Sequence, residues 1–274
     1  MKKVLLTLLL LLANSWSASA LYHSSEVFYN PLITWENCAQ NTSPKSIIAQ
    51  AGLVFYKESG EESDSFFQIP LEFGFAGTKW FSSSFLLPLQ VYTPSEESSE
   101  FGISKPWIKA KFIPQLTKKM SLGARFGLRL PIESSNPDIT AKAWAIDLAM
   151  LVHNTYKSHL LFDAQLGMTL EFTKEDDSKN SSPLYFIAEP GYALNSKIII
   201  QGVLGSSVPV IKGKSDSGSE DAGFKETWVG EKFRWRVSTV VTIQQIFSYR
   251  LGDKTAGKDL FFGFSLTTSI PLVK

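Results

Sequence analysis

The sequence is poor in several features, and each shortage excludes a class of protein. A single cysteine, Cys38, among 274 residues excludes a disulfide scaffold and zinc sites built from several cysteines. Lys and Arg number 27 and Asp and Glu 26, so the basic excess typical of nucleic-acid-binding proteins is missing and we expect no nucleic-acid partner. The chain also lacks a Gly-rich phosphate loop, H-E-x-x-H, a Rossmann fingerprint and a nucleophile elbow. We therefore expect no cofactor, no metal site and no catalytic residues.

Long apolar runs are missing as well. Beyond residue 45 no stretch of about 18 consecutive apolar residues exists, which excludes a helical membrane protein. One short apolar run, Val4 to Leu12, follows two lysines, and Ala18-Ser19-Ala20 then supplies the small residues that signal peptidase accepts. We expect residues 1–20 to be a cleaved signal peptide, so the protein is exported. Residues 21–45 are expected to form a periplasmic extension or a plug in the lumen.

Alternation with period two is the strongest pattern in the remaining chain. In segments 67–75, 122–132 and 160–172 every second residue is apolar, and those between are mostly polar, charged or glycine. Runs of about 9 to 13 residues fit tilted membrane strands better than ordinary strands of 5 or 6. Small residues such as Gly123 and Gly167 on the polar face suit a crowded interior, whereas a water-facing surface would favour Lys and Glu. These segments predict membrane-crossing strands.

The connections between these segments alternate between long and short. Outer-membrane barrels join their strands by short periplasmic turns and long outer loops. The expected strands are 46–57, 65–76, 80–92, 104–116, 120–132, 140–153, 158–172, 184–194, 197–211, 222–229, 233–249 and 259–272. The tenth and eleventh strands follow because a bacterial barrel has an even number of strands. The turn between them is expected at Gly230-Glu231. We predict an all-β protein, a transmembrane antiparallel up-and-down β-barrel of about twelve strands over residues 46–274, or of ten if two weak segments are not strands.

Aromatic residues near the expected strand ends predict girdles at the two membrane interfaces. The expected girdle residues are Tyr56, Trp80, Tyr92, Trp107, Trp228 and Tyr249. In this assignment Trp228 points outward, toward lipid.

The polar faces would line the lumen and carry its charged residues. The expected lumen and constriction residues are Lys109, Lys111, Arg125, Arg129, Glu72, Asp147, Asp163, Glu171, Glu189, Arg234 and Arg236. In the hairpin of the fourth and fifth strands, two registers keep the apolar faces aligned: one sets Lys111 opposite Arg125, the other Lys109 opposite Arg129. Like charges in such positions repel unless they are compensated. A network of salt bridges across the lumen would compensate them, and so would a bound anionic solute, in which case the basic rung favours passage of anions.

The few histidines offer little for chemistry. His153 and His159 flank a predicted short turn and are expected to face each other inside the periplasmic mouth. Two imidazoles without a third ligand make a poor metal site. An outer-membrane hydrolase would need a His, a Ser and an orienting acid at one height near a barrel rim, and the pattern does not bring such a group together.

Gly102, Ser104, Lys111 and Leu130-Pro131 match motifs of a known family, although Ile132-Glu133 departs from its Thr-Gly. The stretch 102–131 resembles outer-membrane channels of the phenol-degradation meta-pathway type, loosely related to long-chain fatty-acid channels. The C-terminal stretch 263–266 resembles that family's closing strand. The resemblance covers about a third of the chain, implies transport of small, apolar compounds, and transfers no functional residue.

Together these patterns predict an outer-membrane β-barrel of a Gram-negative-type bacterium that acts as a passive channel for small solutes, apolar or anionic. Its expected partners are outer-membrane lipid, a small-molecule solute and the barrel-assembly machinery. The first alternative is a non-conducting structural or adhesion barrel, and the second is an outer-membrane enzyme. The third is a soluble exported β-domain, in which the apolar rows would point inward.

Overall fold

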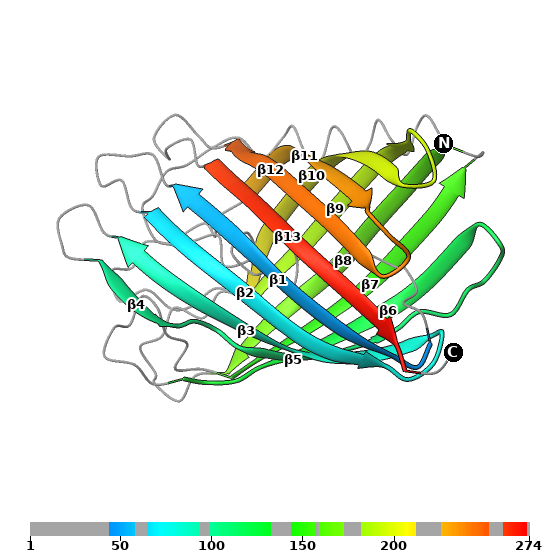
Figure 1. Cartoon of the computed structure of the whole chain (residues 1–274). Coiled ribbons are helices and arrows are strands. Elements are labelled where there is room, and N and C mark those ends of the chain that lie inside the picture. Colours follow the sequence, from blue (N-terminus) through cyan, green and yellow to red (C-terminus); the bar gives the residue numbers. More distant parts are fainter. Residues whose placement is uncertain are drawn as a thin grey trace.

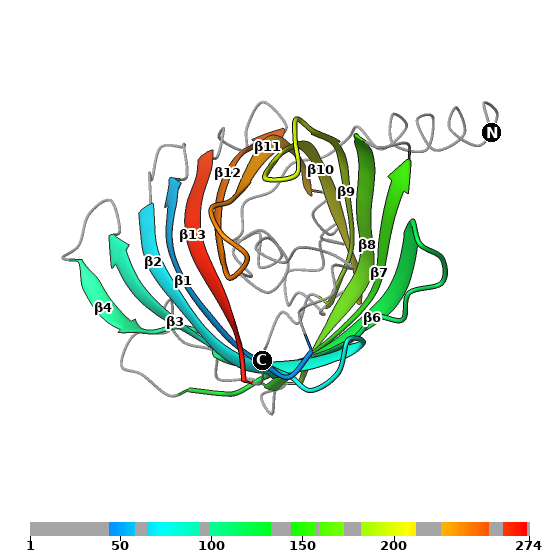
Figure 2. The same cartoon turned by 45° about the vertical axis from the view of Figure 1, so that its right-hand side comes forward.

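One antiparallel sheet forms the protein, and it closes into a barrel (Figures 1 and 2). The computed structural model describes residues 44–57, 65–93, 99–132, 144–156, 159–172, 182–211, 226–251 and 260–272. The strands are β1 (Ser46–Lys57), β2 (Ser65–Ala76), β3 (Phe81–Thr93), β4 (Glu100–Ile103), β5 (Trp107–Phe112), β6 (Met120–Arg129), β7 (Trp144–Tyr156), β8 (Leu160–Phe172), β9 (Ser182–Ala193), β10 (Ile198–Ile211), β11 (Glu226–Arg236), β12 (Val241–Leu251) and β13 (Leu260–Pro271). Closure comes from β1, which pairs with β2 on one side and with β13 on the other.

The short strands β4 and β5 are two parts of one barrel strand. Both pair with β3, β4 near one end of it and β5 near the other. Between them, the amide of Ser104 still donates to the carbonyl of Pro88 at 2.8 Å, whereas Pro106 has no amide hydrogen to donate. Counted as one strand, β4 and β5 leave twelve strands around the barrel, and the predicted fold class is confirmed.

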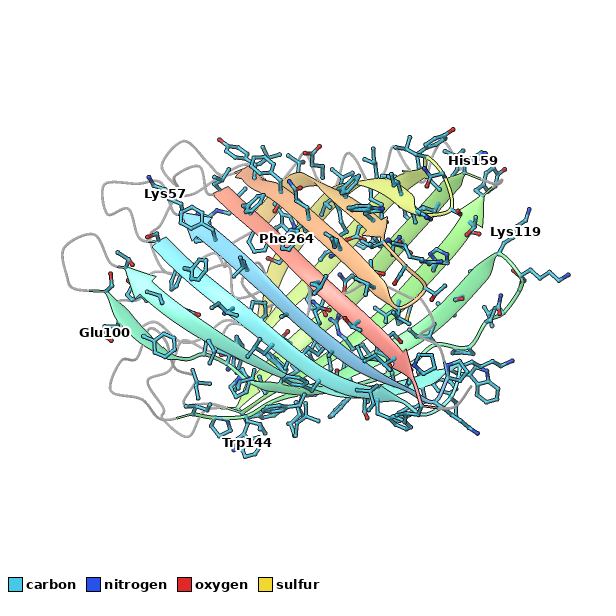
Figure 3. The ribbon with its side chains drawn as sticks, viewed as in Figure 1. Lys57, Glu100, Lys119, Trp144, His159 and Phe264 are labelled. Atoms are coloured by element: carbon cyan, nitrogen blue, oxygen red, sulfur yellow. The ribbon has the colours of Figure 1, made fainter. Side chains whose placement is uncertain are left out.

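The apolar rows point away from the barrel interior, as the alternation predicts. Outward side chains such as Phe73 and Met150 are more than half exposed, while their neighbours Glu72 and Ala149 are buried. In Figure 3, Phe264 lies midway along the barrel on β13, whose even-numbered residues form such a row. A soluble domain cannot keep so much contiguous apolar surface in water. The exterior is therefore a lipid-facing surface, and the soluble alternative is wrong.

The connections alternate between long and short. Between β5 and β6 the turn is short because the bridge of Gln115 to Ser121 continues the pairing beyond the strand ends. Lys119 and His159 mark the end with short turns, and Lys57, Glu100 and Trp144 mark the opposite end (Figure 3). Antiparallel barrels of this construction, with an even number of strands and short periplasmic turns, span the bacterial outer membrane. The protein thus belongs in the outer membrane, with its short turns on the periplasmic side. Among the described residues no helix is long and apolar enough to cross a membrane.

Four of the short turns share one construction. The side-chain oxygens of Thr78, Thr117, Asn195 and Ser238 each accept hydrogen bonds from the backbone amides two and three residues later. Ser, Thr and Asn favour turns because their side chains replace backbone partners in this way.

The turn predicted at Gly230-Glu231 is wrong, and so is the single strand predicted over 233–249. Both residues lie inside β11, where Gly230 pairs with Val203 and Ser248. The chain turns instead after Arg236, at the turn that Ser238 caps. A Cβ on Gly230 would lie 2.3 Å from the carbonyl oxygen of Phe247, so this glycine permits close packing of strands and does not make a turn.

The predicted girdle is wrong for four of its six residues. Trp107, Trp228, Tyr56 and Tyr92 are buried on the inward face, whereas Trp80 is exposed and Tyr249 is half-buried. For Trp228 the cause is the misplaced turn. Because β11 continues to Arg236 without a turn at Gly230-Glu231, Trp228 shares the inward face with Lys232 and Arg234.

The predicted pairing of the two histidines is also wrong. His153 lies opposite Asp163, because β7 continues to Tyr156, which pairs with Leu160. His159 immediately precedes β8, and its Nδ1 is 3.1 Å from the carbonyl oxygen of Ala193. The predicted signal peptide and nearly all of segment 21–45 lie outside the described residues.

Candidate functional site: the charged interior

Inward-facing residues of β2 and of β5 to β11 bring most of the predicted lumen residues together. The β5–β6 hairpin adopts the first predicted register, with Lys111 opposite Arg125, Lys109 opposite Gly127 and Trp107 opposite Arg129. Two cations therefore face each other across a strand pair, as expected.

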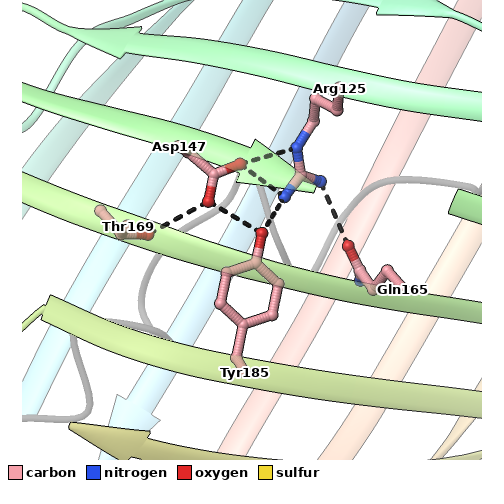
Figure 4. Close-up of polar contacts among 5 residues, drawn as sticks. All are labelled: Arg125, Asp147, Gln165, Thr169 and Tyr185. Atoms are coloured by element: carbon pink, nitrogen blue, oxygen red, sulfur yellow. Dashed lines mark hydrogen bonds and ion pairs between the residues drawn. The ribbon is translucent and has the colours of Figure 1, made fainter. Parts of the chain in front are cut away.

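Arg125 is the centre of the best-connected cluster (Figure 4). Its Nη2 and Nε donate to Asp147 Oδ1 at 2.9 and 3.0 Å, and its Nη1 donates to Gln165 Oε1 at 3.2 Å. Asp147 Oδ2 accepts hydrogen bonds from the hydroxyls of Tyr185 at 2.8 Å and Thr169 at 3.1 Å. Arg125 Nη2 also donates to the Tyr185 hydroxyl. Because both charged side chains have zero exposure, this network replaces the water that they lose.

Two further ion pairs lie in the interior. Arg129 Nη2 lies 2.6 Å from Glu171 Oε1, and the guanidinium of Arg129 sits 5.9 Å from the ring centroid of Trp107. Lys109 Nζ lies 2.8 Å from Glu72 Oε2 and connects β5 to β2 across β3.

Near the short-turn end, the imidazole of His153 joins a second polar chain. His153 Nδ1 lies 2.6 Å from Asp163 Oδ1, and Asp163 Oδ2 accepts a hydrogen bond from Gln201 Nε2 at 2.8 Å. His153 Nε2 lies 3.3 Å from the hydroxyl of Thr155, so a hydroxyl, an imidazole and a carboxylate do meet here, contrary to the sequence-based expectation. The sequence did not indicate this group because its hydroxyl belongs to a threonine and because His153 lies opposite Asp163 and not opposite His159.

Lys232 is an interior residue that the sequence reasoning missed. Its ammonium pairs with Glu189, and both side chains are almost fully buried. The predicted turn at Gly230-Glu231 placed Lys232 outside a strand. Lys232 lies two residues before Arg234, and this spacing would have placed both side chains on the same face of one strand. Arg234 is buried on the same face, and Arg236 lies exposed at the end of β11.

Small residues make room for large inward side chains. A Cβ on Gly205 would lie 2.1 Å from Trp228 Cε2, and one on Gly167 would lie 2.3 Å from the Tyr185 hydroxyl. Each glycine therefore accepts an aromatic ring from the neighbouring strand. This explains the expected enrichment of small residues on the polar faces.

An apolar cluster occupies the interior together with the ion pairs. Its buried members are Val54, Tyr56, Ile113, Ala149, Leu151, Tyr185, Ile187, Val203, Trp228, Ile246 and Phe261. Tyr185 belongs to both groups, since its ring packs in this cluster and its hydroxyl bonds to Asp147. The interior thus combines fixed, paired charges with aromatic and aliphatic surface.

Each interior carboxylate that the sequence predicts has a basic partner. Asp147 pairs with Arg125, Glu72 with Lys109, Glu171 with Arg129, Glu189 with Lys232 and Asp163 with His153. The carboxylate of Asp147, which pairs with Arg125, compensates the repulsion between Lys111 and Arg125. Chemically, this wall offers a solute oriented donors and acceptors, and the Lys and Arg pairs balance their own charges.

No family model and no curated protein matches the sequence. Among solved structures, the chain is similar to an outer membrane channel from Pseudomonas putida F1, with a TM-score of 0.72 and 13% identity over 86% of this chain and 99% of that one. It is also similar to the NanC porin, with a TM-score of 0.53 and 9% identity over 81% of this chain and 98% of that one. The resemblance to outer-membrane channels is thus confirmed at the level of the fold.

Proposed function

We propose that the protein is a passive outer-membrane channel for small solutes, apolar or anionic, with the interior ion pairs as its constriction. The observation that carries this proposal is the polar lining of β7 and β8. Along these two strands, paired groups run from Glu171 near the long-connection end, through Asp147, to Asp163 near the short-turn end. A polar lining over this length gives a solute hydrogen-bond partners from one rim of the barrel to the other.

The lining supports both solute classes. Lys111 is half-buried opposite Arg125 and adds a cation to the lumen wall that a passing anion can reach. The aromatic and aliphatic side chains of the same wall suit apolar solutes. The likeness to a solved outer membrane channel supports the same proposal. Barrel-assembly machinery is the proposed partner during insertion, since barrels of this class reach the membrane as exported chains.

Single-channel recording in planar bilayers tests the proposal directly. We expect discrete conductance steps from the wild-type protein. Arg129→Gln should shift the reversal potential toward cation preference, because Glu171 then keeps its charge without a partner. The double variant Arg129→Gln/Glu171→Gln removes the whole pair and should return the preference close to that of the wild type. Complete silence of correctly folded protein would overturn the channel proposal.

One observation favours the alternative of a non-conducting barrel. Tyr56, Leu151, Trp228 and Phe261 are each at most 1% exposed, which is the burial of a filled interior. Under this alternative we propose that residues 21–45 act as a plug. A mature chain that begins at residue 44 should then conduct where the full chain is silent, whereas equal silence from both would indicate a permanently closed barrel.

An enzymatic role is the remaining alternative, and it would rest on Thr155, His153 and Asp163. Covalent labelling of Thr155 by a fluorophosphonate, lost in His153→Gln, would support it. Unlabelled protein would remove this alternative and leave the channel proposal untouched.

A further inference from the structure

We infer that the short-turn rim binds the headgroups of anionic phospholipids in the membrane leaflet that faces it, through Lys45, Lys79, Lys118, Lys119 and Lys197. These lysines are far apart in the sequence, and the up-and-down order of the antiparallel strands brings them to one rim. Lys119 extends from this rim in Figure 3. All five are exposed.

The charge at this rim has one sign within the described residues. Its turns and strand ends, residues 44–46, 76–81, 112–120, 155–156, 159–160, 193–198, 236–241 and 271–272, contain no Asp or Glu. The described strand ends at the opposite rim carry both signs, with Lys57 and Glu100. The short-turn rim is therefore electrostatically complementary to phosphate.

Exposed aromatic side chains lie directly beside the lysines. Phe112, Tyr156 and Tyr192 lie on the outward faces at the ends of their strands, and Trp80 lies in the β2–β3 turn. Each of the four is at least 46% exposed. The ammonium of Lys79 sits 5.6 Å from the ring centroid of Trp80. Aromatic rings favour the boundary between acyl chains and headgroups, and lysine stems extend from that boundary toward polar groups. This arrangement places the ammonium groups at the depth of lipid phosphates.

The distribution of the lysines points to lipid as the occupant. They come from the start of β1, the β2–β3 turn, the β5–β6 turn and the β9–β10 turn, which spreads them around the rim. A folded protein partner would need about 800 Å² of contiguous surface on one side, whereas the lipids surrounding a barrel contact its whole circumference. Lysine also acts as a point charge toward phosphate and needs no fixed fork geometry.

Lipid competition on the intact protein tests the inference. The mature chain is placed in nanodiscs that contain equal amounts of phosphatidylglycerol and phosphatidylcholine, and the lipids that stay bound are identified by native mass spectrometry. Wild type should retain phosphatidylglycerol preferentially. In a quadruple variant, Lys79→Gln/Lys118→Gln/Lys119→Gln/Lys197→Gln, the preference for phosphatidylglycerol should be weaker by a factor of at least about ten. Each lysine near an anionic surface strengthens binding several-fold.

Lys57→Gln at the opposite rim is the matched control and should leave the preference unchanged. Heat-modifiable migration in gels confirms that each variant is folded, and single Lys119→Gln and Lys197→Gln variants replace the quadruple variant if it does not fold. The inference is overturned if folded variants keep the wild-type preference, or if Lys57→Gln lowers it equally. It is also overturned if isolated peptidoglycan binds to this rim while phosphatidylglycerol shows no preference.

Discussion

The barrel interior has two regions that differ in chemistry although their strands share one outward pattern. From β5 to β11 the inward face carries charged groups in pairs, centred on Arg125 and Asp147. Where the barrel closes, along β13 and β1, the inward groups are neutral. There Thr267 donates to Gln50 and Ser269 to Ser46, each at 3.1 Å. Both regions present apolar rows to lipid.

This difference teaches that the two faces of a barrel strand are constrained separately. Lipid requires apolar side chains at alternate positions on every strand. The interior requires only that buried polar groups find partners, which paired charges and neutral hydrogen bonds both achieve. The consequences of losing a partner differ, because a buried charge left alone is far more costly than a neutral group left alone.

Removing a counter-ion from the charged region should have the largest effect. Asp147→Ala leaves the buried guanidinium of Arg125 without its carboxylate, so we expect the free energy of unfolding to fall by about 3–5 kcal/mol. Urea unfolding from lipid vesicles, followed by tryptophan fluorescence, measures this change. Ser248→Ala, which removes a buried neutral hydroxyl from β12, serves as the control and should cost about 1 kcal/mol or less. Equal losses would show that the two regions do not differ energetically.

A steric change should come next in size. In Gly205→Ala the new methyl group would overlap the indole of Trp228, so we expect a loss of about 1–3 kcal/mol and a shift in tryptophan emission. Gly202→Ala on the outward face of the same strand meets only Pro190, at 3.9 Å, and should be nearly neutral. If both variants unfold alike, the close approach of Trp228 to Gly205 is not a constraint.

Removal of one hydroxyl from the charged cluster should have a smaller effect. Tyr185→Phe keeps the ring beside Gly167 but removes the hydrogen bond to Asp147 and the acceptor for Arg125, and we expect a loss of about 1.5–3 kcal/mol because the partners are charged. In the background of Asp147→Ala the same substitution should cost clearly less. The double-mutant cycle by urea unfolding measures this coupling, and strict additivity would contradict the network.

The smallest effect is expected where the barrel closes. Thr267→Val removes a single neutral hydrogen bond to Gln50 while it preserves the β-branched shape, so a loss of about 0.5–1.5 kcal/mol should follow. The same urea titration checks it. A loss as large as that of Asp147→Ala would reverse the proposed difference between the two regions.

The alternation and the connection lengths predicted the outward rows and about twelve strands, because both depend on local period and spacing. For the β5–β6 hairpin they left two registers open, and the structure has the one with Lys111 opposite Arg125. The inward position of Trp228 and the pairing of Lys232 with Glu189 were missed for one reason. A glycine followed by a charged residue at Gly230-Glu231 has the composition of a turn, and only packing against the backbone of β12 gives Gly230 another role. The contact of His153 with Asp163 was missed because the turn between β7 and β8 begins later than expected.

By itself, the sequence determined which residues contact lipid in the strands whose alternation is unbroken, such as β2, β6 and β8, since a strand turns successive side chains to opposite faces whatever its neighbours are. The ends of the barrel likewise follow from where long and short connections fall. Which interior groups meet was decided by the tertiary structure alone. Arg125, Asp147, Gln165 and Tyr185 come from four successive strands, β6 to β9, and their contacts depend on ladder registers and on curvature across the sheet. Those quantities are set by the pairing of whole strands, so no local pattern encodes them.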